Sequence, residues 1–214
     1  METLLPVIAI AGAISIGAMS PGPSFVVVVR TAVALSRRDG MAAALGMGVG
    51  GMVFAGLALL GLTALLAQVE WLYLGLKVLG GLYLIYLATR LWRGAREPIQ
   101  LTEAAGQRPD APRKTRWRSF ALGLTTQLSN PKTAIFYASV FAALLPAKTD
   151  LETAGFLLPV IFLIETGWYA IVAWALSSER PRRAYLRWKA KIDRLAGTVM
   201  ALLGIRLITD AVRI

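Results

Sequence analysis

Two charged side chains lie inside long apolar runs, where a charge is costly. Glu165 lies within an apolar run at 154–177, and Lys132 lies within another at 118–145. A carboxyl group at the centre of a membrane costs about 3 kcal/mol on insertion scales, so such acids are usually retained for a pathway or for proton transfer. Trp168 and Tyr169, three and four positions after Glu165, share its helical face and are expected to border a pocket. The alternative is a purely structural Glu165, protonated or paired.

Two proline signals interrupt apolar runs. Ser20-Pro21-Gly22-Pro23 lies within the run at 4–33, and Gln127 and Asn130-Pro131-Lys132 lie within the run at 118–145. Proline removes an amide donor and glycine adds backbone freedom, so a helix should break at both places. At membrane depth such breaks are tolerated where they line a cavity or are covered by protein. Each run is therefore predicted to form two half-helices.

The half-helices predict an anion site. The first should restart near Ser24, and the second should use Asn130 as its N-cap and Pro131 as its first residue. With the two half-helices running in opposite directions from near the midplane, their amide ends would converge and suit a substrate carboxylate. Prolines that merely kink packed helices are the alternative.

Lys132 would lie just inside a helix N-terminus, where the helix dipole disfavours a cation. Glu165 is the one acid expected at a comparable depth. We therefore expect an ion pair between Lys132 and Glu165, broken by protonation or by substrate. A snorkelling Lys132 is the alternative.

The composition excludes several classes of chemistry. The chain has no cysteine and no histidine, which removes thiolate and imidazole metal ligands and leaves carboxylates as the proton carriers. No phosphate-binding loop and no nucleophile-base arrangement is present. The chain is predicted not to be an enzyme and to need no cofactor, with a proton as the coupling ion.

The chain is predicted to be an integral membrane protein. Of its 214 residues 57% are hydrophobic and 16% charged, and the mean hydropathy is +0.62. The net charge of +11 would suggest nucleic-acid binding in a soluble protein, but here the basic residues fall between apolar runs and orient them, so the lipid bilayer and not nucleic acid is the expected partner.

Six transmembrane helices are predicted, at 4–33, 40–67, 71–91, 118–145, 154–177 and 195–213. Arginine and lysine are concentrated in the first, third and fifth connections. The positive-inside rule places those connections in the cytoplasm and both termini outside.

The two halves are predicted to be repeats. Gly81 is followed nine positions later by Arg90-Leu91, and Gly197 is followed at the same spacing by Arg206-Leu207, while the proline breaks recur in the same order. Three spans per repeat require the second to be inverted. We expect a first repeat at 1–93, a flexible basic cytoplasmic linker at 94–117 and a second repeat at 118–214. The alternative is chance similarity between apolar helices. Gly46 and Gly50 are assigned to close helix packing.

These features together resemble the LysE/RhtB family of amino-acid exporters over essentially the whole chain. The resemblance rests on six spans, on the two proline motifs and on an acid followed by Trp168 in the fifth span. It implies export of amino acids or close derivatives from the bacterial cytoplasm, driven by a proton or ion gradient, and it points to Pro21, Gly22, Pro23, Asn130, Pro131 and Lys132. Glu165 stands where the family commonly has Asp, which leaves the pocket size open.

The sequence thus predicts an all-helical exporter of the bacterial inner membrane. An amino acid would bind with its carboxylate near the half-helix ends and its amine near Glu165, and antiported protons would reset the carrier. A small-solute channel and a membrane scaffold that docks partners on its basic loops are the alternatives. Which amino acid is carried, and whether the chain forms a homo-oligomer, stay open.

Overall fold

The computed structural model describes residues 4–68, 70–97, 115–145 and 151–212, and every regular element in these ranges is an α-helix. The eight helices are α1 (Leu4–Met19), α2 (Pro23–Ala34), α3 (Arg37–Gln68), α4 (Glu70–Gly94), α5 (Thr115–Leu128), α6 (Pro131–Leu144), α7 (Leu151–Leu176) and α8 (Glu179–Val212). The prediction of an all-helical chain is confirmed.

Four of the helices are long and apolar enough to cross a membrane. These spans are Arg37–Gly61, Leu74–Gly94, Thr153–Leu176 and Glu179–Val212. The first predicted run forms the broken pair that its proline motif predicts, Pro6–Met19 and Pro23–Ala34, with 59° between the two helices. Counted as one broken span, this pair brings the described residues to five candidates.

The fourth predicted run breaks at its proline motif as expected, whereas the helix of the sixth begins earlier than expected. The run at 118–145 forms two helices of 14 residues each, so neither reaches the roughly 20 residues that cross a bilayer. The sixth span, expected from 195, belongs to a helix that begins at Glu179. Hydropathy alone missed the start of α8 because Lys189 and Asp193 form an i,i+4 ion pair, and both are buried.

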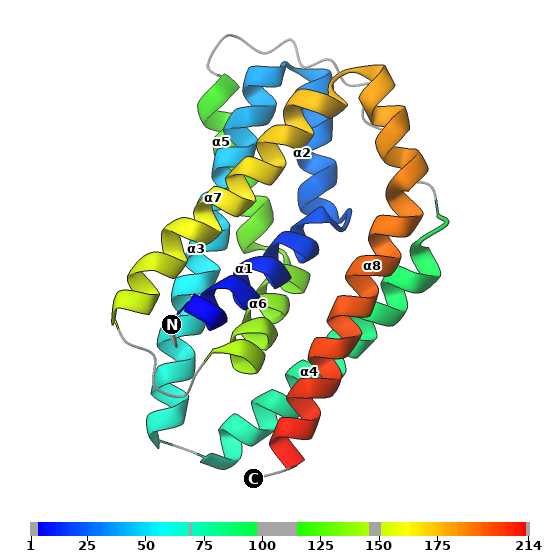
Figure 1. Cartoon of the computed structure of the whole chain (residues 1–214). Helices are drawn as coiled ribbons and strands as arrows, with labels where there is room; N and C mark the ends of the chain where they lie inside the picture. Colours follow the sequence, from blue (N-terminus) through cyan, green and yellow to red (C-terminus); the bar gives the residue numbers. More distant parts are fainter. Residues whose placement is uncertain (1–3, 69, 98–114, 146–150, 213–214) are drawn as a thin grey trace.

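Helix α3 runs through the centre of the bundle between α5 and α7 (Figure 1). A methyl group added to Gly46 would lie 2.6 Å from the Leu124 nitrogen of α5, and one added to Gly50 would lie 2.7 Å from Gln127 Cβ. Gly51 faces α7, where an added methyl would lie 2.9 Å from Glu165 Cγ. The assignment of Gly46 and Gly50 to close helix packing is confirmed.

Helices α4 and α8 form a second, antiparallel unit beside this bundle (Figure 1). They touch backbone to backbone, since a methyl group added to Gly81 would lie 2.7 Å from the Gly204 carbonyl oxygen. A methyl group added to Gly197 would likewise lie 3.1 Å from the Ala88 carbonyl oxygen.

Basic residues gather at one end of the molecule. The C-terminus of α2, the start of α3, the start of α5 and the turn between α7 and α8 all lie at the top of Figure 1, and they carry Arg37, Arg38, Arg116, Arg118 and Arg180. Of the expected linker at 94–117, residues 98–114 lie outside the described residues, so the division into 1–93, 94–117 and 118–214 stays a prediction.

Candidate functional site

The two helix breaks meet in the middle of the protein. From there α2 rises towards the top of Figure 1 and α6 descends. Their N-termini are adjacent, because Lys132 Nζ lies 3.6 Å from the position that a Cβ on Gly22 would occupy. Two positive dipole ends therefore face one region, as the sequence predicted.

Asn130 begins α6 and ties it to α2. Its Oδ1 accepts a hydrogen bond from the Lys132 backbone nitrogen at 3.1 Å, which caps the helix, and Pro131 is the first helical residue. The Asn130 side-chain nitrogen donates to Ser24 Oγ at 3.3 Å, in the first turn of α2. The predicted N-cap is confirmed, and one side chain spans both breaks.

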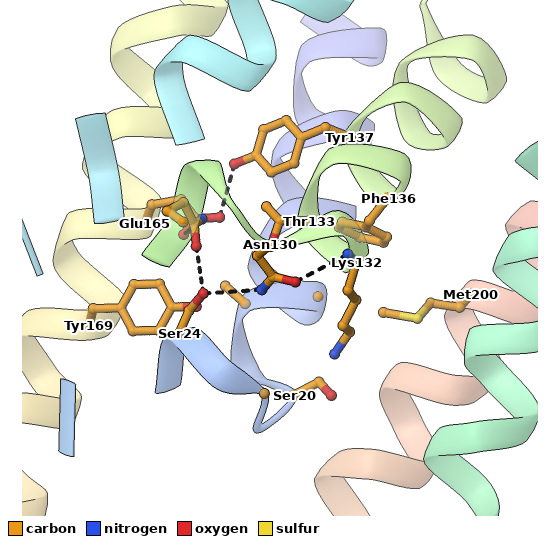
Figure 2. A pocket seen from close by; sticks show the side chains of 14 residues that line it. Ser20, Ser24, Asn130, Lys132, Thr133, Phe136, Tyr137, Glu165, Tyr169 and Met200 are labelled. Carbon is orange, nitrogen blue, oxygen red and sulfur yellow. Dashed lines mark hydrogen bonds between the residues drawn. The ribbon is translucent and has the colours of Figure 1, made fainter. Parts of the chain in front are cut away.

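A chain of hydrogen bonds runs from Asn130 to Glu165 (Figure 2). Ser24 Oγ donates to Gln127 Oε1 at 2.7 Å, and Gln127 Nε2 donates to Glu165 Oε2 at 3.2 Å. Tyr137 Oη donates to the other carboxylate oxygen, Oε1, at 2.9 Å. We call these five residues the polar chain; it joins α2, α5, α6 and α7 through buried groups only. Gln127 uses both ends of its amide, so its orientation is determined by its neighbours.

The polar chain lies between two apolar clusters. On α7, Ile161 belongs to one cluster and Tyr169 to the other, with Glu165 between them. Only 3% of Glu165 is exposed. Since a buried polar group is costly without partners, the four hydrogen bonds are what allow the carboxylate and amide to remain there.

A small cavity of about 40 Å³ opens beside the polar chain. Ser20, Gly22, Lys132, Tyr169 and Met200 line it together with the polar chain itself. Water needs about 10 to 15 Å³ when volume is measured in this way, so the small cavity holds a few waters at most. The hydroxyl of Ser20 is buried here and has no hydrogen-bond partner in the structure.

A large cavity of about 500 Å³ adjoins the small one. Gly22, Asn130 and Lys132 belong to both. The wall of the large cavity also includes Pro21, Pro23, Pro131, Arg90, Glu97, Lys189 and Asp193. Its volume falls in the range of small-molecule sites, about 300 to 1,000 Å³. The helix breaks thus form the boundary between a water-sized space and a ligand-sized one.

The expected ion pair between Lys132 and Glu165 is not formed. Both Glu165 oxygens accept hydrogen bonds from neutral donors, Gln127 and Tyr137. Among the described residues Lys132 makes no ion pair at all. The prediction was wrong because the first turn of α6 directs Lys132 towards Gly22 and the cavities, and the amide of Gln127 supplies the donor that the lysine was expected to supply.

Asp193 is a buried acid in the wall of the large cavity. Its Oδ2 pairs with Lys189 Nζ at 2.9 Å, and its Oδ1 is buried and unpartnered. Lys189 Nζ also donates to the carbonyl oxygens of Gly94 at 2.8 Å and Ala95 at 3.3 Å, at the C-terminal end of α4. A second buried acid thus lies beside the half-helix ends.

The cavities include most, but not all, of the predicted site residues. Ser20, Gln127 and Glu165 line the small cavity, the three prolines line the large one, and Gly22, Asn130 and Lys132 line both. Trp168 lines neither: it packs against the apolar cluster around Phe25, and its ring nitrogen is buried without a partner. Tyr169, which was expected beside it, does line the small cavity.

Sequence reasoning missed Ser24, Tyr137 and Asp193. Ser24 follows the proline break directly and Tyr137 lies six positions after Pro131, so a search for polar side chains within two turns of each break would have found both. Asp193 was hidden because its helix was expected to begin after it. Over the described residues, no three acidic side chains come together to form a metal site.

Comparison with known proteins gives similarity along almost the whole chain. The family described as LysE type translocator matches residues 15–211. The threonine efflux protein of Escherichia coli (strain K12) is 38% identical over 191 residues, which cover 89% of this chain and 91% of that protein. The membrane protein YahN of the same strain is 32% identical over 214 residues, covering 99% and 93%. The leucine efflux protein of Klebsiella pneumoniae subsp. pneumoniae is 25% identical over 182 residues, covering 85% and 82%. No solved structure matches the chain significantly.

Proposed function

The chain belongs to the LysE type translocator family, and from that premise we propose that it exports amino acids from the cytoplasm across the bacterial inner membrane by proton antiport. The names of its relatives support an amino-acid substrate, since they include threonine and leucine efflux proteins. The observation that carries the proposal is Lys132: an ammonium group without an ion-pair partner among the described residues, in the wall of a 500 Å³ cavity, beside two helix N-termini.

That arrangement suits a substrate carboxylate. Two dipole ends and a lysine all favour negative charge, and a bound carboxylate would supply the counter-ion that Lys132 lacks. The large cavity has the volume for a whole amino acid, whereas the small cavity beside Glu165 has not. The geometry therefore supports a substrate held at the breaks rather than next to Glu165.

Glu165 is then free to serve as the proton site. A proton added to its Oε1 makes that oxygen a donor, and the Tyr137 hydroxyl can rotate to accept. The Gln127 amide nitrogen on Oε2 cannot accept, so Tyr137 defines the side on which the proton is held. Gln127 and Ser24 connect this carboxyl to the start of α2. Proton binding would thus be felt at the break that forms the substrate site.

We further propose six spans arranged as two inverted repeats, with α5 and α6 together as the fourth. Pairing the Gly81 motif with the Gly197 motif also pairs Ala88 with Gly204. Gly81 lies close to Gly204, and the equivalent pair, Gly197 and Ala88, also lies close together. Two repeats related by an approximate two-fold axis would make this same contact twice. The basic end of the bundle would face the cytoplasm and both chain termini the outside.

The test is uptake of labelled threonine, leucine, homoserine and lysine into inside-out vesicles with an acidic interior. The native chain should accumulate at least one of them, and Lys132→Met should abolish accumulation. Lys191→Met is the matched control, because its ammonium lies over the Trp188 ring, 4.3 Å from the centroid and away from both cavities.

Glu165→Gln separates transport from coupling. It should leave downhill exchange of the amino acid measurable while removing the response to the pH gradient. Failure of the native chain to accumulate any of the four amino acids would refute the export proposal. A gradient response that survives in Glu165→Gln would refute the role of Glu165 alone.

A further inference from the structure

We propose that Asp193 binds the α-ammonium group of the transported amino acid in the large cavity, opposite Lys132 at its α-carboxylate. This inference rests on the proposed function and deepens it, because it defines the substrate class as α-amino acids with both groups free and charged. N-acylated derivatives, 2-hydroxy acids and simple amines would be excluded.

Asp193 has a carboxylate oxygen without a hydrogen bond, and it belongs to the wall of the large cavity. The residue is 2% exposed and lines the large cavity. Its Oδ2 holds Lys189, but its Oδ1 has no hydrogen-bond partner among the described residues. An unsatisfied buried carboxylate oxygen is costly, so a native structure that keeps one commonly gives it a partner in another state. An ammonium group is the donor that suits it best.

Lys189 has hydrogen-bond partners besides Asp193, so Asp193 can turn from Lys189 to the substrate ammonium group. Besides Asp193 it donates to the carbonyl oxygens of Gly94 and Ala95. If Asp193 turns towards a ligand in the cavity, Lys189 keeps two acceptors at the end of α4. The ammonium group of Lys189 therefore keeps two hydrogen-bond acceptors when Asp193 turns to the substrate.

The charges of the cavity are complementary to a zwitterion. Lys132 and Asp193 are close enough for their charges to interact, yet they form no ion pair. A zwitterion between them would place its carboxylate beside Lys132, which has no ion-pair partner among the described residues, and its ammonium group beside the unused oxygen of Asp193. Lys189 also lines the cavity and is paired with Asp193. Arg90 and Glu97, the remaining charged groups in its wall, are exposed, so water screens them and they contribute little selectivity.

Glu165 lacks the features that mark Asp193. Both of its oxygens already accept hydrogen bonds, and the space beside it is about 40 Å³. An ammonium there would have to displace Gln127 or Tyr137 and bring a whole amino acid into a volume that holds a few waters. The two buried acids thus have separate tasks: Asp193 holds the substrate, and Glu165 holds the proton.

The experiment is displacement of a labelled amino acid from the purified full chain by three unlabelled probes. The probes are the amino acid itself, its 2-hydroxy acid and its decarboxylated amine; for threonine these are 2,3-dihydroxybutanoate and 1-aminopropan-2-ol. In the native chain the hydroxy acid should displace on the order of 10- to 100-fold more weakly than the amino acid, since it lacks a charge-assisted hydrogen bond.

In Asp193→Asn this ratio should fall towards one, while the ratio between the amino acid and the decarboxylated amine persists. Asp210→Asn is the matched control on the same helix, since Asp210 pairs with Arg206 on the exposed surface. Lys189→Met combined with Asp193→Asn removes the ion pair as a unit and serves if the single variant fails to fold.

The outcomes distinguish the two proposals. If the native chain binds and accumulates an amino acid but Asp193→Asn keeps its preference over the hydroxy acid, this inference is overturned and the export proposal stands. The same holds if Glu165→Gln loses that preference instead. If the native chain binds and accumulates no amino acid, the export proposal fails and the inference fails with it.

Discussion

The polar chain predicts a specific energetic coupling between Ser24 and Gln127. Gln127→Leu removes two side-chain hydrogen bonds, those to Ser24 and Glu165, and Ser24→Ala removes two, those to Gln127 and Asn130. The double variant removes three and not four, because the Ser24 to Gln127 bond is shared. At about 0.5 to 1.5 kcal/mol per bond, each single variant should lower the free energy of unfolding by about 1 to 3 kcal/mol. The double variant should lower it by less than the sum of the two single variants, and the difference should equal the energy of one hydrogen bond.

The assay is equilibrium unfolding of the four proteins in mixed detergent micelles, followed by circular dichroism. The expected coupling energy is about 0.5 to 1.5 kcal/mol; the average for such bonds in a membrane protein is near 0.6 kcal/mol. Gln127→Leu combined with Thr198→Ala is the control cycle, because the Thr198 hydroxyl bonds only its own helix, at the Arg194 carbonyl oxygen. Coupling below about 0.3 kcal/mol between Ser24 and Gln127, or coupling of equal size in the control, would refute the polar chain as drawn.

Three further perturbations test the parts that hold the site. Gly46→Ala should lower the free energy of unfolding by about 1 to 3 kcal/mol, because the added methyl group meets the backbone of α5. Gly12→Ala is the control and should be neutral or slightly stabilising, because nothing lies within 4 Å of the added group. Equal effects of the two variants would contradict the close packing of α3 and α5. Asn130→Ala should cost about 1 kcal/mol through the lost cap and about 0.5 to 1.5 kcal/mol more through the lost bond to Ser24. Asn130→Ser should recover the part due to the cap, and a thermal melt that does not separate the two variants would argue against the cap. Tyr185→Phe should cost no more than about 1 kcal/mol, because it loses one long hydrogen bond, to the Met19 carbonyl oxygen, but keeps its ring stacked at 4.9 Å on Phe25 of α2. Tyr185→Ala should cost at least about 1 kcal/mol more in the same unfolding assay. Similar losses in the two variants would mean that the stacked rings contribute nothing to stability.

The two cavities share Gly22, Asn130 and Lys132, so the proposed substrate site and the proposed proton site would lie next to each other. A substrate carboxylate at Lys132 would lie against Asn130. From Asn130 the hydrogen bonds of the polar chain lead through Ser24 and Gln127 to Glu165. The substrate and the proton would then both contact the residues at the helix breaks. Energetic coupling between the two proposed sites would need only these residues and not the rest of the bundle.

Much of the fold follows from local patterns. The apolar runs determine that the chain is a helical membrane protein, and Asn130-Pro131 determines where α6 begins, because the cap and the proline act within one turn. Gly46 and Gly50 mark a packing face, since small residues at this spacing allow close contact whichever helix lies opposite. The clustering of basic residues at one end also follows from the order of the runs.

The partners of the buried charges could not be read from the sequence. Hydropathy ranks Lys132, Glu165, Lys189 and Asp193 as costly one at a time, whereas their cost depends on which groups lie within about 3 Å after packing. Lys132 was expected beside Glu165, but an amide and a phenol take that place and the lysine faces the cavities. Asp193 and Lys189 neutralise each other and so allow α8 to extend through a segment that composition marks as a loop. That the chain is helical and apolar enough for a membrane follows from its sequence, because burial of apolar surface sums over a run. Which acid faces which cavity depends on packing, because electrostatic and hydrogen-bond energies depend on distances between residues far apart in the chain.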